Sequence, residues 1–430
     1  MALWQTLRML GASRVAPPAE PVQLRRQGLL RELAEAAQAR VVGEDEQAGL
    51  LVIERAFAAE TMHGQWPVRL ALEIPAEAAA FIAGDERLRE MQAEQALFFD
   101  VETTSLGTAA GTLVFLLGGG FFRSGQFIVR QCFLADPAGE AAFLERALSL
   151  FSQGGYLVSY NGRHFDAPLL EGRFTLHRRR ASISSLPHVD LLYAARKLYR
   201  RLLPDCCLPT VEREVLGVRR EGLDVPSFLV PQLYFEYLRT GEPGGMCRVL
   251  YHNAVDVLSL AALYGVIGQA VCFRRLSRAE EAAAAAEWFA ATGRLTEAVA
   301  ALRRALALER DPAGRSHLLL RLSLLLKRAG QWQEATQIWR YLVQSGLDAQ
   351  GIAHVELAKF LEHRAHDYRA AIEVVQEALK SPAAQSIALR EALSHRLERL
   401  QHKATRSCVS AERESLAALE RRQRQGEKEG

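Results

Sequence analysis

The pattern of apolar and polar positions divides the chain into a part with strand and helix patterns and a later part with helix patterns alone. Short apolar runs bounded by glycine, proline or polar clusters predict strands at 49–57, 68–74, 97–102, 112–117, 127–134 and 156–160. Apolar residues at helical spacing predict helices at 25–40, 138–151, 191–202 and around 250–261. From about residue 278 the chain is rich in Ala, Leu, Arg and Glu and has no strand-like run.

The order of the predicted elements between residues 97 and 160 favours a particular α/β architecture. Three strands joined by short turns predict an antiparallel meander, and a helix and a fourth strand follow. This is the order of a ribonuclease H-like fold, a mixed sheet with flanking helices. Gly118-Gly119-Gly120 is not followed by G-K-[ST] or by a helix start, so we expect a bend or bulge there and no phosphate loop.

The later part of the chain contains an internal repeat. When three similar segments are aligned, Ala298, Ala335 and Ala371 fall at the same position, 37 and 36 residues apart. This interval is close to the tetratricopeptide period of about 34 residues, in which each unit is a pair of helices. The chain is therefore predicted to have an N-terminal extension packing on the next domain, an α/β domain, an all-α helical-repeat (TPR-like) domain and a charged tail, at 1–95, 96–272, 278–405 and 406–430.

Composition limits the possible classes of protein. The 430 residues are 49% hydrophobic and 24% charged, which suffices for two or three domains with separate cores. The net charge of +3 is too small to argue for nucleic acid or membrane binding. Six cysteines without C-x-x-C spacing favour a reducing compartment, and we expect neither a signal peptide nor a membrane span, so the predicted location is cytoplasmic.

Two carboxylates lie one residue apart at the end of a predicted core strand. Side chains at i and i+2 of a strand point to the same face, so Asp100 and Glu102 are expected to project together. Burying two like charges is costly, and a divalent cation that prefers oxygen ligands, such as Mg²⁺ or Mn²⁺, would relieve the repulsion. The alternative is a strand end whose acids face solvent.

Two further acids follow in other contexts. Asp166 comes after a strand and an Asn161-Gly162 turn, where a helix begins, and an ordinary helix N-cap is the alternative interpretation. Asp256 lies beside the apolar stripe of a predicted helix, with His252 four residues earlier on the same face. Taken alone, His252 would be interpreted as a structural histidine.

Together these segments resemble the three motifs of the DEDD superfamily of 3′-to-5′ exonucleases, and the surrounding sequence is similar to the YprB-like predicted exonucleases. The resemblance covers roughly residues 96–267 and implies a ribonuclease H-like nuclease with two divalent cations, Mg²⁺ or Mn²⁺. The metal ligands that it implies are Asp100, Glu102, Asp166 and Asp256. The superfamily places a tyrosine four residues, or a histidine five residues, before the last acid, whereas this chain has His252 and Tyr251 at those spacings.

The general base is predicted from helix geometry and acidity. A residue four positions before Asp256 is offset by about 40° on the helix, and one five positions before by about 140°. His252 is therefore expected to face the acids, and an imidazole titrates nearer neutrality than the phenol of Tyr251.

The expected substrate is the 3′ end of single-stranded DNA or RNA. Arg173 is one of eight basic residues between positions 171 and 201, where only two acids occur, so phosphates are predicted to bind there. A solvated helix face is the alternative for this basic segment. Within the motifs that carry the resemblance, substrate contacts are assigned to Thr103, Leu106, Asn161 and Phe165.

The helical repeats are expected to dock a protein partner. The competing hypothesis for the whole chain is a catalytically weak or inactive nucleic-acid-binding or scaffold protein that acts through these repeats.

Overall fold

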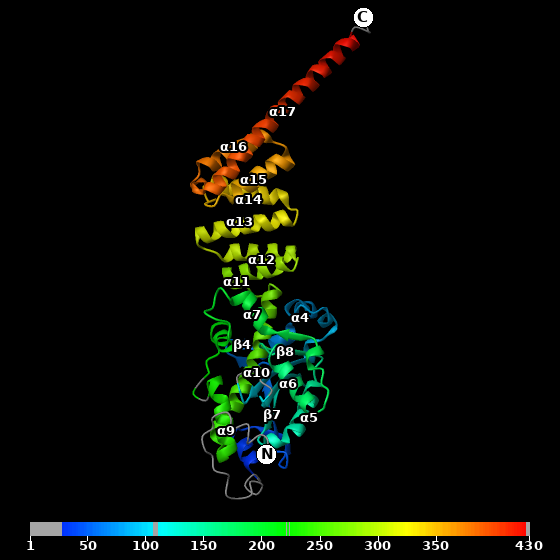
Figure 1. Ribbon diagram of the computed structural model, residues 1–430, viewed down its shortest axis with the longest axis vertical. Helices are drawn as coiled ribbons and strands as arrows, with labels where there is room; N and C mark the ends of the chain where they lie inside the picture. The colour runs from blue at the N-terminus through cyan, green and yellow to red at the C-terminus, as the bar shows by residue number, and fades with distance from the viewer. Residues whose placement is uncertain (1–27, 106–110, 221, 223, 427–430) are drawn as a thin grey trace. The chain divides into compact units, whose positions relative to one another are not determined.

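The structure is a computed structural model, and it describes residues 28–105, 111–220, 222 and 224–426, with side chains to residue 406. The chain forms two compact units, Met1–Arg275 and Leu276–Gly430. The first unit holds every described strand and the second is helical, as Figure 1 shows. Each unit is described by itself below.

The first unit is built on a mixed sheet of seven strands in the order β1-β2-β7-β6-β5-β8-β9. Each neighbouring pair in the series β2, β7, β6, β5 is antiparallel, whereas β5, β8 and β9 are parallel to one another. The strands are β1 (Arg40–Asp45), β2 (Leu50–Ala58), β5 (Ala96–Thr103), β6 (Val114–Arg123), β7 (Gln126–Leu134), β8 (Tyr156–Ser159) and β9 (His188–Asp190), with a separate pair β3 (Met62–His63) and β4 (Trp66–Pro67). The predicted meander and the mixed sheet with helices are confirmed.

The helices of the first unit cover this sheet. They are α3 (Leu29–Ala36), α4 (Ala76–Ala83), α5 (Glu140–Phe151), α6 (Asp166–Leu176), α7 (Leu191–Tyr199), α8 (Leu208–Val211), α9 (Val230–Thr240) and α10 (Pro243–Val271). The irregular turns that matter below are the 3₁₀ turns η1 (Val68–Glu73) and η7 (Ser227–Leu229) and the π-helical turn η6 (Glu212–Leu216).

Helix α10 is the core helix of the first unit, and its side chains are buried almost continuously from Val249 to Val271. It is long and apolar enough to cross a membrane, with a mean hydropathy of 1.7 over 18 residues, and that window is 100% buried. The prediction that no segment approaches such a span was wrong for this helix. A helix that is apolar on all sides is typical of the core of a large domain as well as of a membrane.

The three glycines of β6 allow this helix to lie close to the sheet. A Cβ atom at Gly118 would lie 2.2 Å from Oδ1 of Asn253 on α10, and one at Gly119 would lie 2.5 Å from Leu150 of α5. The strand pairs in regular register with β5 and β7 through all three glycines. The prediction of a bend or bulge was therefore wrong, because the glycines serve close packing on both faces of the strand.

The N-terminal part differs from the prediction in two respects. Strands β1 and β2 extend the central sheet, so this segment does more than pack on the next domain. The predicted strand at 68–74 is the 3₁₀ turn η1, followed by Ile74. Its buried residues Val68, Ala71 and Ile74 recur every three positions, which fits the three residues per turn of a 3₁₀ helix and not the alternation of a strand.

The second unit is a series of helix pairs that follow one another in order (Figure 1). Its helices are α11 (Ala279–Ala291), α12 (Leu295–Leu308), α13 (Pro312–Arg328), α14 (Trp332–Gln344), α15 (Ile352–Phe360), α16 (Tyr368–Lys380) and α17 (Ile387–Gly426). The three aligned alanines at 298, 335 and 371 are each 0% exposed, one in each of α12, α14 and α16. The repeated alanine thus marks where the second helix of each pair packs.

A buried glutamate joins the turn between α15 and α16 to the last helix, α17. Glu362 lies in the π-helical turn η8 (Leu361–Ala365), and its side chain is 0% exposed. It accepts hydrogen bonds from Arg396 at 2.7 Å, Arg399 at 2.9 Å and Lys403 at 2.8 Å, all on α17. Burial opposes ionisation, but these cations hold the pKa of Glu362 at about 2. Its charge is therefore fully compensated within the chain.

Candidate active site

Asp100 lies on the central strand β5, directly beside Gly118 of β6. Its Oδ2 accepts a hydrogen bond of 2.9 Å from Nδ2 of Asn253 on α10. The Asn253 side chain is fixed in turn by Gln131, which donates to Asn253 Oδ1 at 2.8 Å. Burial raises the pKa of Asp100 well above its usual range, and the carboxylates of Asp256, Glu102 and Asp166 raise it further. The four predicted acids therefore lie within electrostatic reach of one another.

Glu102 lies two residues farther along β5 and is 9% exposed. Within the described part of the chain, no hydrogen-bond donor is assigned to its carboxylate, and Nε2 of His252 lies 4.0 Å from its Oε1. Burial raises the pKa of Glu102 well above its usual range, and Asp256 and Asp166 add to the effect. A buried carboxylate without a donor is costly, so this side chain requires a cation or a proton.

Asp166 is the first residue of α6 and follows a tight turn in which Asn161 has a φ of 67°. Phe165 is the N-cap, so the predicted alternative of Asp166 as an ordinary cap is not observed. Burial, followed by the charge of Asp190, raises the pKa of Asp166 to about 7. No donor to its carboxylate is found among the residues that the structure describes.

Asp190 supports this turn from β9. Its carboxylate accepts hydrogen bonds from the backbone N–H groups of Asn161 at 2.7 Å, Arg163 at 3.2 Å and Leu192 at 3.1 Å. The bond to Leu192 caps the start of α7, and the other two bonds hold the loop that precedes Asp166. Asp190 is thus a buried acid whose oxygens are satisfied, unlike those of Asp166.

Asp256 projects from the middle of α10 and is 8% exposed. Its Oδ1 accepts a hydrogen bond from Arg220, whose guanidinium also binds Glu212 of η6 at 2.8 and 2.5 Å. Because Arg220 occupies one side of the carboxylate, the other oxygen, Oδ2, is the one that faces His252 at 3.4 Å.

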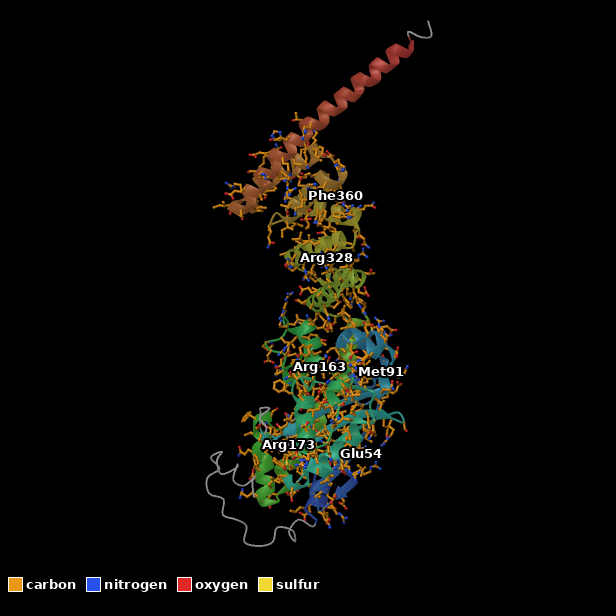
Figure 2. All side chains as sticks on the ribbon, turned by 45° about the vertical axis from the view of Figure 1, so that its right-hand side comes forward. Glu54, Met91, Arg163, Arg173, Arg328 and Phe360 are labelled. Carbon is orange, nitrogen blue, oxygen red and sulfur yellow. The ribbon has the colours of Figure 1, made fainter. Side chains whose placement is uncertain are left out.

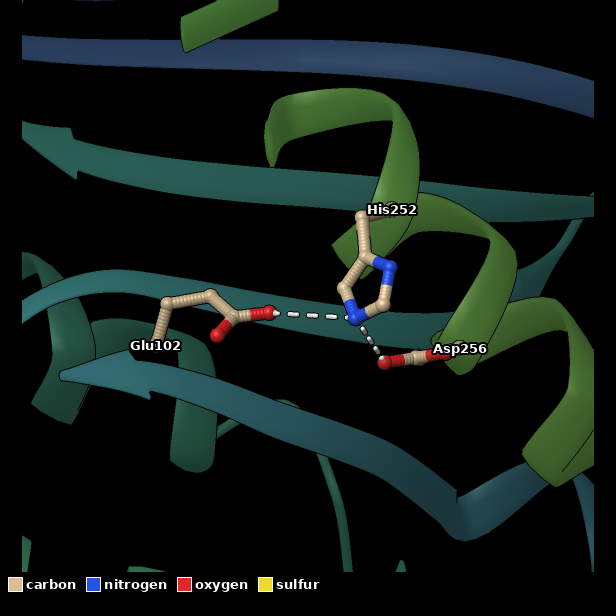
Figure 3. A group of neighbouring side chains, drawn as sticks. All are labelled: Glu102, His252 and Asp256. Carbon is tan, nitrogen blue, oxygen red and sulfur yellow. Dashed lines mark ion pairs between the residues drawn. The ribbon is translucent and has the colours of Figure 1, made fainter. Parts of the chain in front are cut away.

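His252 lies one turn before Asp256 on α10, and Figure 3 shows its imidazole between the carboxylates of Glu102 and Asp256. Its Nε2 atom is 4.0 Å from Glu102 Oε1 and 3.4 Å from Asp256 Oδ2. Its Nδ1 atom lies 2.6 Å from Oδ1 of Asp224. The contacts with His252 and Arg220 outweigh burial and hold the pKa of Asp224 below its usual range. The helix geometry thus places His252, as predicted, on the same side as Asp256.

Glu102 and Asp166 lie on a cleft of about 190 Å³. Its other lining residues are Val101, Thr103, Ser105, Phe165 and Leu169, with Ser227 of η7 and Val230 and Pro231 of α9. Phe165 is 47% exposed, so its ring is available at the edge of the cleft. Thr103 lines the cleft, Asn161 lies in the turn before Asp166, and Leu106 lies outside the described residues.

Arg173 does not line the cleft. Arg173, labelled in Figure 2, belongs to α6. It forms a bidentate ion pair with buried Glu140 of α5, at 2.5 Å for each bond, and only 14% of its side chain is exposed. Arg179 pairs with Glu145 at 2.5 Å in the same region. The position of Arg173 argues against the predicted phosphate contact, because its guanidinium already joins α6 to α5.

Three residues that lie beside the cluster of acids were not predicted from the sequence as members of the site. Glu212, Arg220 and Asp224 belong to loops and short turns between α8 and α9, where the apolar pattern is weak and charged residues ordinarily face solvent. His63 of β3 also lies beside α10, since its Nε2 is 2.6 Å from Oγ of Ser259, and burial lowers its pKa to about 4. No spacing in the sequence relates these loops to Asp256.

The donor set fits divalent cations. Ligand atoms of Glu102, His252 and Asp256 lie within 4.8 Å of one another and all three residues are buried. Asp100 and Asp166 add further carboxylate oxygens near the same place. Carboxylates suit Mg²⁺ and Mn²⁺, and an imidazole suits transition metals.

Comparison with known proteins agrees with this geometry. Residues 97–267 match the RNase_H superfamily, which indicates a nuclease domain that acts on nucleic acid with divalent metals. The chain is 36% identical over 310 residues to the uncharacterized protein YprB of Bacillus subtilis (strain 168), a match that covers 71% of this chain and 74% of that protein. The chain therefore belongs to the YprB family and carries an RNase_H superfamily domain within its first unit.

Proposed function

We propose that this protein is a metal-dependent nuclease that removes nucleotides from the 3′ end of nucleic acid. The observation that carries the proposal is the convergence of Asp100, Glu102, Asp166 and Asp256 from three segments of the chain. Among the described residues, no hydrogen-bond donor is assigned to the carboxylates of Glu102 and Asp166, and their raised pKa values reflect a cluster that can accept more positive charge than these residues supply.

The four carboxylates would hold two divalent cations, Mg²⁺ or Mn²⁺. Bound cations of this kind make water nucleophilic at neutral pH and stabilise the charge on the leaving oxygen. Asn253 orients Asp100 through its hydrogen bond, and Arg220 orients Asp256, so both acids are fixed before substrate binds. Asp190 holds the turn that presents Asp166.

The cleft suits a single nucleic-acid strand. Phe165 presents an exposed ring beside Asp166, where a nucleobase would stack, and η7 and the start of α9 also line the cleft. The 3′-to-5′ direction is supported by the resemblance of the three acidic motifs to the DEDD exonucleases.

The second unit would serve as a docking module of tetratricopeptide type. Three helix pairs with a buried alanine at the same position, 37 and 36 residues apart, support this assignment. Stacked helix pairs of this kind bury a continuous core and leave long surfaces for a partner.

The test is a nuclease assay on 5′-labelled oligonucleotides. Purified full-length protein with Mn²⁺ or Mg²⁺ is expected to shorten single-stranded DNA or RNA stepwise from the 3′ end. A substrate whose terminal 3′ linkages are phosphorothioates should resist, whereas the same modification at the 5′ end should have little effect.

Two controls decide whether the hydrolysis belongs to this site. The Glu102→Gln variant should be inactive. The control variant Glu90→Ala, which removes an exposed acid, should hydrolyse the substrate at the parent rate. Internal cleavage that is indifferent to the 3′ modification would contradict the exonuclease assignment, and absence of metal-dependent hydrolysis on every substrate would contradict the nuclease assignment.

A further inference from the structure

We propose that His252 is a metal ligand, and that with Glu102 and Asp256 it forms a site for a divalent transition-metal cation, for which Mn²⁺ is the probe. The inference rests on the proposed function, because it assigns one ligand and a metal preference within that site. It differs from the base role predicted from the sequence, in which the imidazole would accept a proton from water.

The first argument is the separation of the three ligand atoms. Nε2 of His252 lies 3.4 Å from Oδ2 of Asp256 and 4.0 Å from Oε1 of Glu102. Two ligands that each lie about 2.1 Å from one ion are about 3 to 4 Å apart. The three atoms are thus spaced for one ion, and Figure 3 shows them pointing toward one another from β5 and α10.

The second argument is the partner of the other ring nitrogen. Nδ1 of His252 lies 2.6 Å from Oδ1 of Asp224, the shortest contact that the imidazole makes, and 3.0 Å from Nη1 of Arg220. The guanidinium can only donate, but it also pairs with Asp224 at 3.3 Å, so the shorter contact with the carboxylate favours the proton on Nδ1 and leaves the lone pair on Nε2. A histidine that binds a metal almost always donates its other N–H to a carboxylate, a carbonyl or water in this way.

The third argument is the charge around Nε2. With the proton on Nδ1, the lone pair of Nε2 faces two buried carboxylates, and among the described residues the hydroxyl that comes within reach is that of Ser227, at 3.5 Å. Three electron-rich atoms that converge in this way repel one another, and a cation between them removes the repulsion. Arg220 does not occupy that position, because it binds Oδ1 of Asp256 and approaches the Nδ1 side of the imidazole, whereas Oδ2 of Asp256 faces Nε2.

The ligand set determines which metal the site prefers. Mg²⁺ is bound mainly through oxygen, whereas an imidazole increases the affinity for transition metals. Asp100 and Asp166 offer oxygen only, so the preference for Mn²⁺ over Mg²⁺ should reside with His252.

The second unit contains a matched control. Nδ1 of His354 also lies 2.6 Å from a carboxylate, that of Asp348, and His354 is 5% exposed, close to the 4% of His252. No group of metal-ligating residues is found around His354 among the described residues. Substitution of His354 therefore removes an equally buried aspartate-bound imidazole at a place where no metal is expected.

The experiment measures the metal environment directly. The full-length protein is freed of metal with a chelator, loaded with one equivalent of Mn²⁺ and examined by electron spin-echo envelope modulation. We expect coupling to ¹⁴N of an imidazole in the parent and in His354→Gln, and its loss in His252→Gln. Asp224→Asn should keep the coupling but weaken Mn²⁺ binding by about 10 to 100-fold in calorimetric titration, with a smaller effect on Mg²⁺.

Each outcome has a definite meaning. Mn²⁺ that binds without ¹⁴N coupling in the parent, or with coupling that persists in His252→Gln, would overturn the ligand assignment. If such a protein still hydrolyses nucleic acid, the proposed function stands and only the role of His252 is wrong. A parent that neither binds Mn²⁺ nor hydrolyses nucleic acid would overturn both.

Discussion

Two buried glutamates, one in each unit, occupy opposite electrostatic environments. The Glu362 side chain is 0% exposed and accepts hydrogen bonds from three cations of α17, which hold its pKa at about 2. Glu102 is 9% exposed and has no assigned donor among the described residues, and its pKa is raised well above its usual range. Burial is therefore similar, and the supply of positive charge differs.

This difference separates a structural acid from a functional one. A carboxylate that the chain compensates in full can only stabilise the fold, because its oxygens are already occupied. A carboxylate that the chain leaves uncompensated costs stability and retains capacity for an external cation. The first unit concentrates three acids of the second kind, Asp100, Glu102 and Asp166, around one cleft.

The largest expected effect is loss of hydrolysis when one of the four clustered acids is removed. Asp100→Ala or Asp256→Ala should lower the rate by about 10³-fold or more, since a bound metal contributes several kcal/mol to transition-state stabilisation. The fold should persist in circular dichroism, because removal of a carboxylate also removes repulsion. Near-parent activity of either variant with both Mg²⁺ and Mn²⁺ would show that the site is elsewhere.

The next effect concerns the compensated acid. Glu362→Gln leaves three cations without their anion and should destabilise the second unit by on the order of 3 kcal/mol at pH 7. Because the folded-state pKa is below the unfolded value, this contribution is present above about pH 4.5 and is lost as the pH falls toward 2. Urea unfolding of parent and variant at pH 7 and pH 3 measures it.

The control for this experiment is an exposed pair on the same helix stack. Glu373, which is 68% exposed and 3.6 Å from Arg369, should tolerate Gln with a change below about 0.5 kcal/mol. If Glu362→Gln were equally mild, the cluster would contribute nothing to the attachment of α17.

An opposite pH dependence is expected for Asp166. In metal-free protein, Asp166→Asn should stabilise the first unit by about 2 kcal/mol at pH 7, because the parent must bury a charge. With a folded-state pKa of about 7, above the unfolded value, the advantage of the variant should vanish as the pH falls to about 4.

Calorimetry of the metal-free full-length chain at pH 7 and pH 4 measures this gain. Asp190→Asn is the matched control and should be destabilising, since three backbone donors depend on that carboxylate. Destabilisation by Asp166→Asn at pH 7 would mean that Asp166 is compensated after all.

A smaller effect on hydrolysis is expected when the second unit, which contains Glu362, is removed entirely. A chain that ends at Arg275 should fold and retain metal-dependent hydrolysis of short oligonucleotides within about threefold of the parent, as expected of an independent domain. Activity per active site, determined with and without residues 276–430, tests this. A soluble, folded but inactive fragment would show that the second unit contributes to the chemistry.

The smallest effect is expected for Tyr251→Phe, which removes a hydroxyl and keeps the ring. Tyr251 is half-buried, and the described contacts assign no hydrogen bond to its side chain. The variant should remain within about twofold of the parent in kcat/KM. A severe loss would mean that the tyrosine hydroxyl, and not His252, acts beside Asp256.

The sequence predicted the elements that carry their own periodicity. The meander, α5 and β8 follow from apolar alternation and helical spacing, and the repeated alanines at 298, 335 and 371 predicted the helix pairs. The prediction of a strand at residues 68–74 was wrong, because a run of apolar residues fits a strand and a 3₁₀ turn equally well before the burial pattern is known.

Prediction of the candidate site had a similar limit. Acids on the sheet strand and on the core helix could be found because an apolar context makes a charge conspicuous, as at Asp100 and Asp256. Arg220 and Asp224 could not be found, since their loop has no periodicity and the partners that bring them to the site, Asp256 and His252 on α10, lie more than 25 residues away in the chain. The ion pair of Arg173 with Glu140 was likewise invisible, because both residues look solvent-facing in the sequence.

The glycines of β6 limit how this domain can change by mutation. A methyl group at position 118 would meet the side-chain oxygen of Asn253 at 2.2 Å, and one at 120 would meet Val257 at 2.6 Å. Either substitution would press against the helix that carries Asp256, and the first would also disturb the hydrogen bond to Asp100. An inactive variant of this enzyme can therefore arise from one added carbon atom, with every charged group still in the chain.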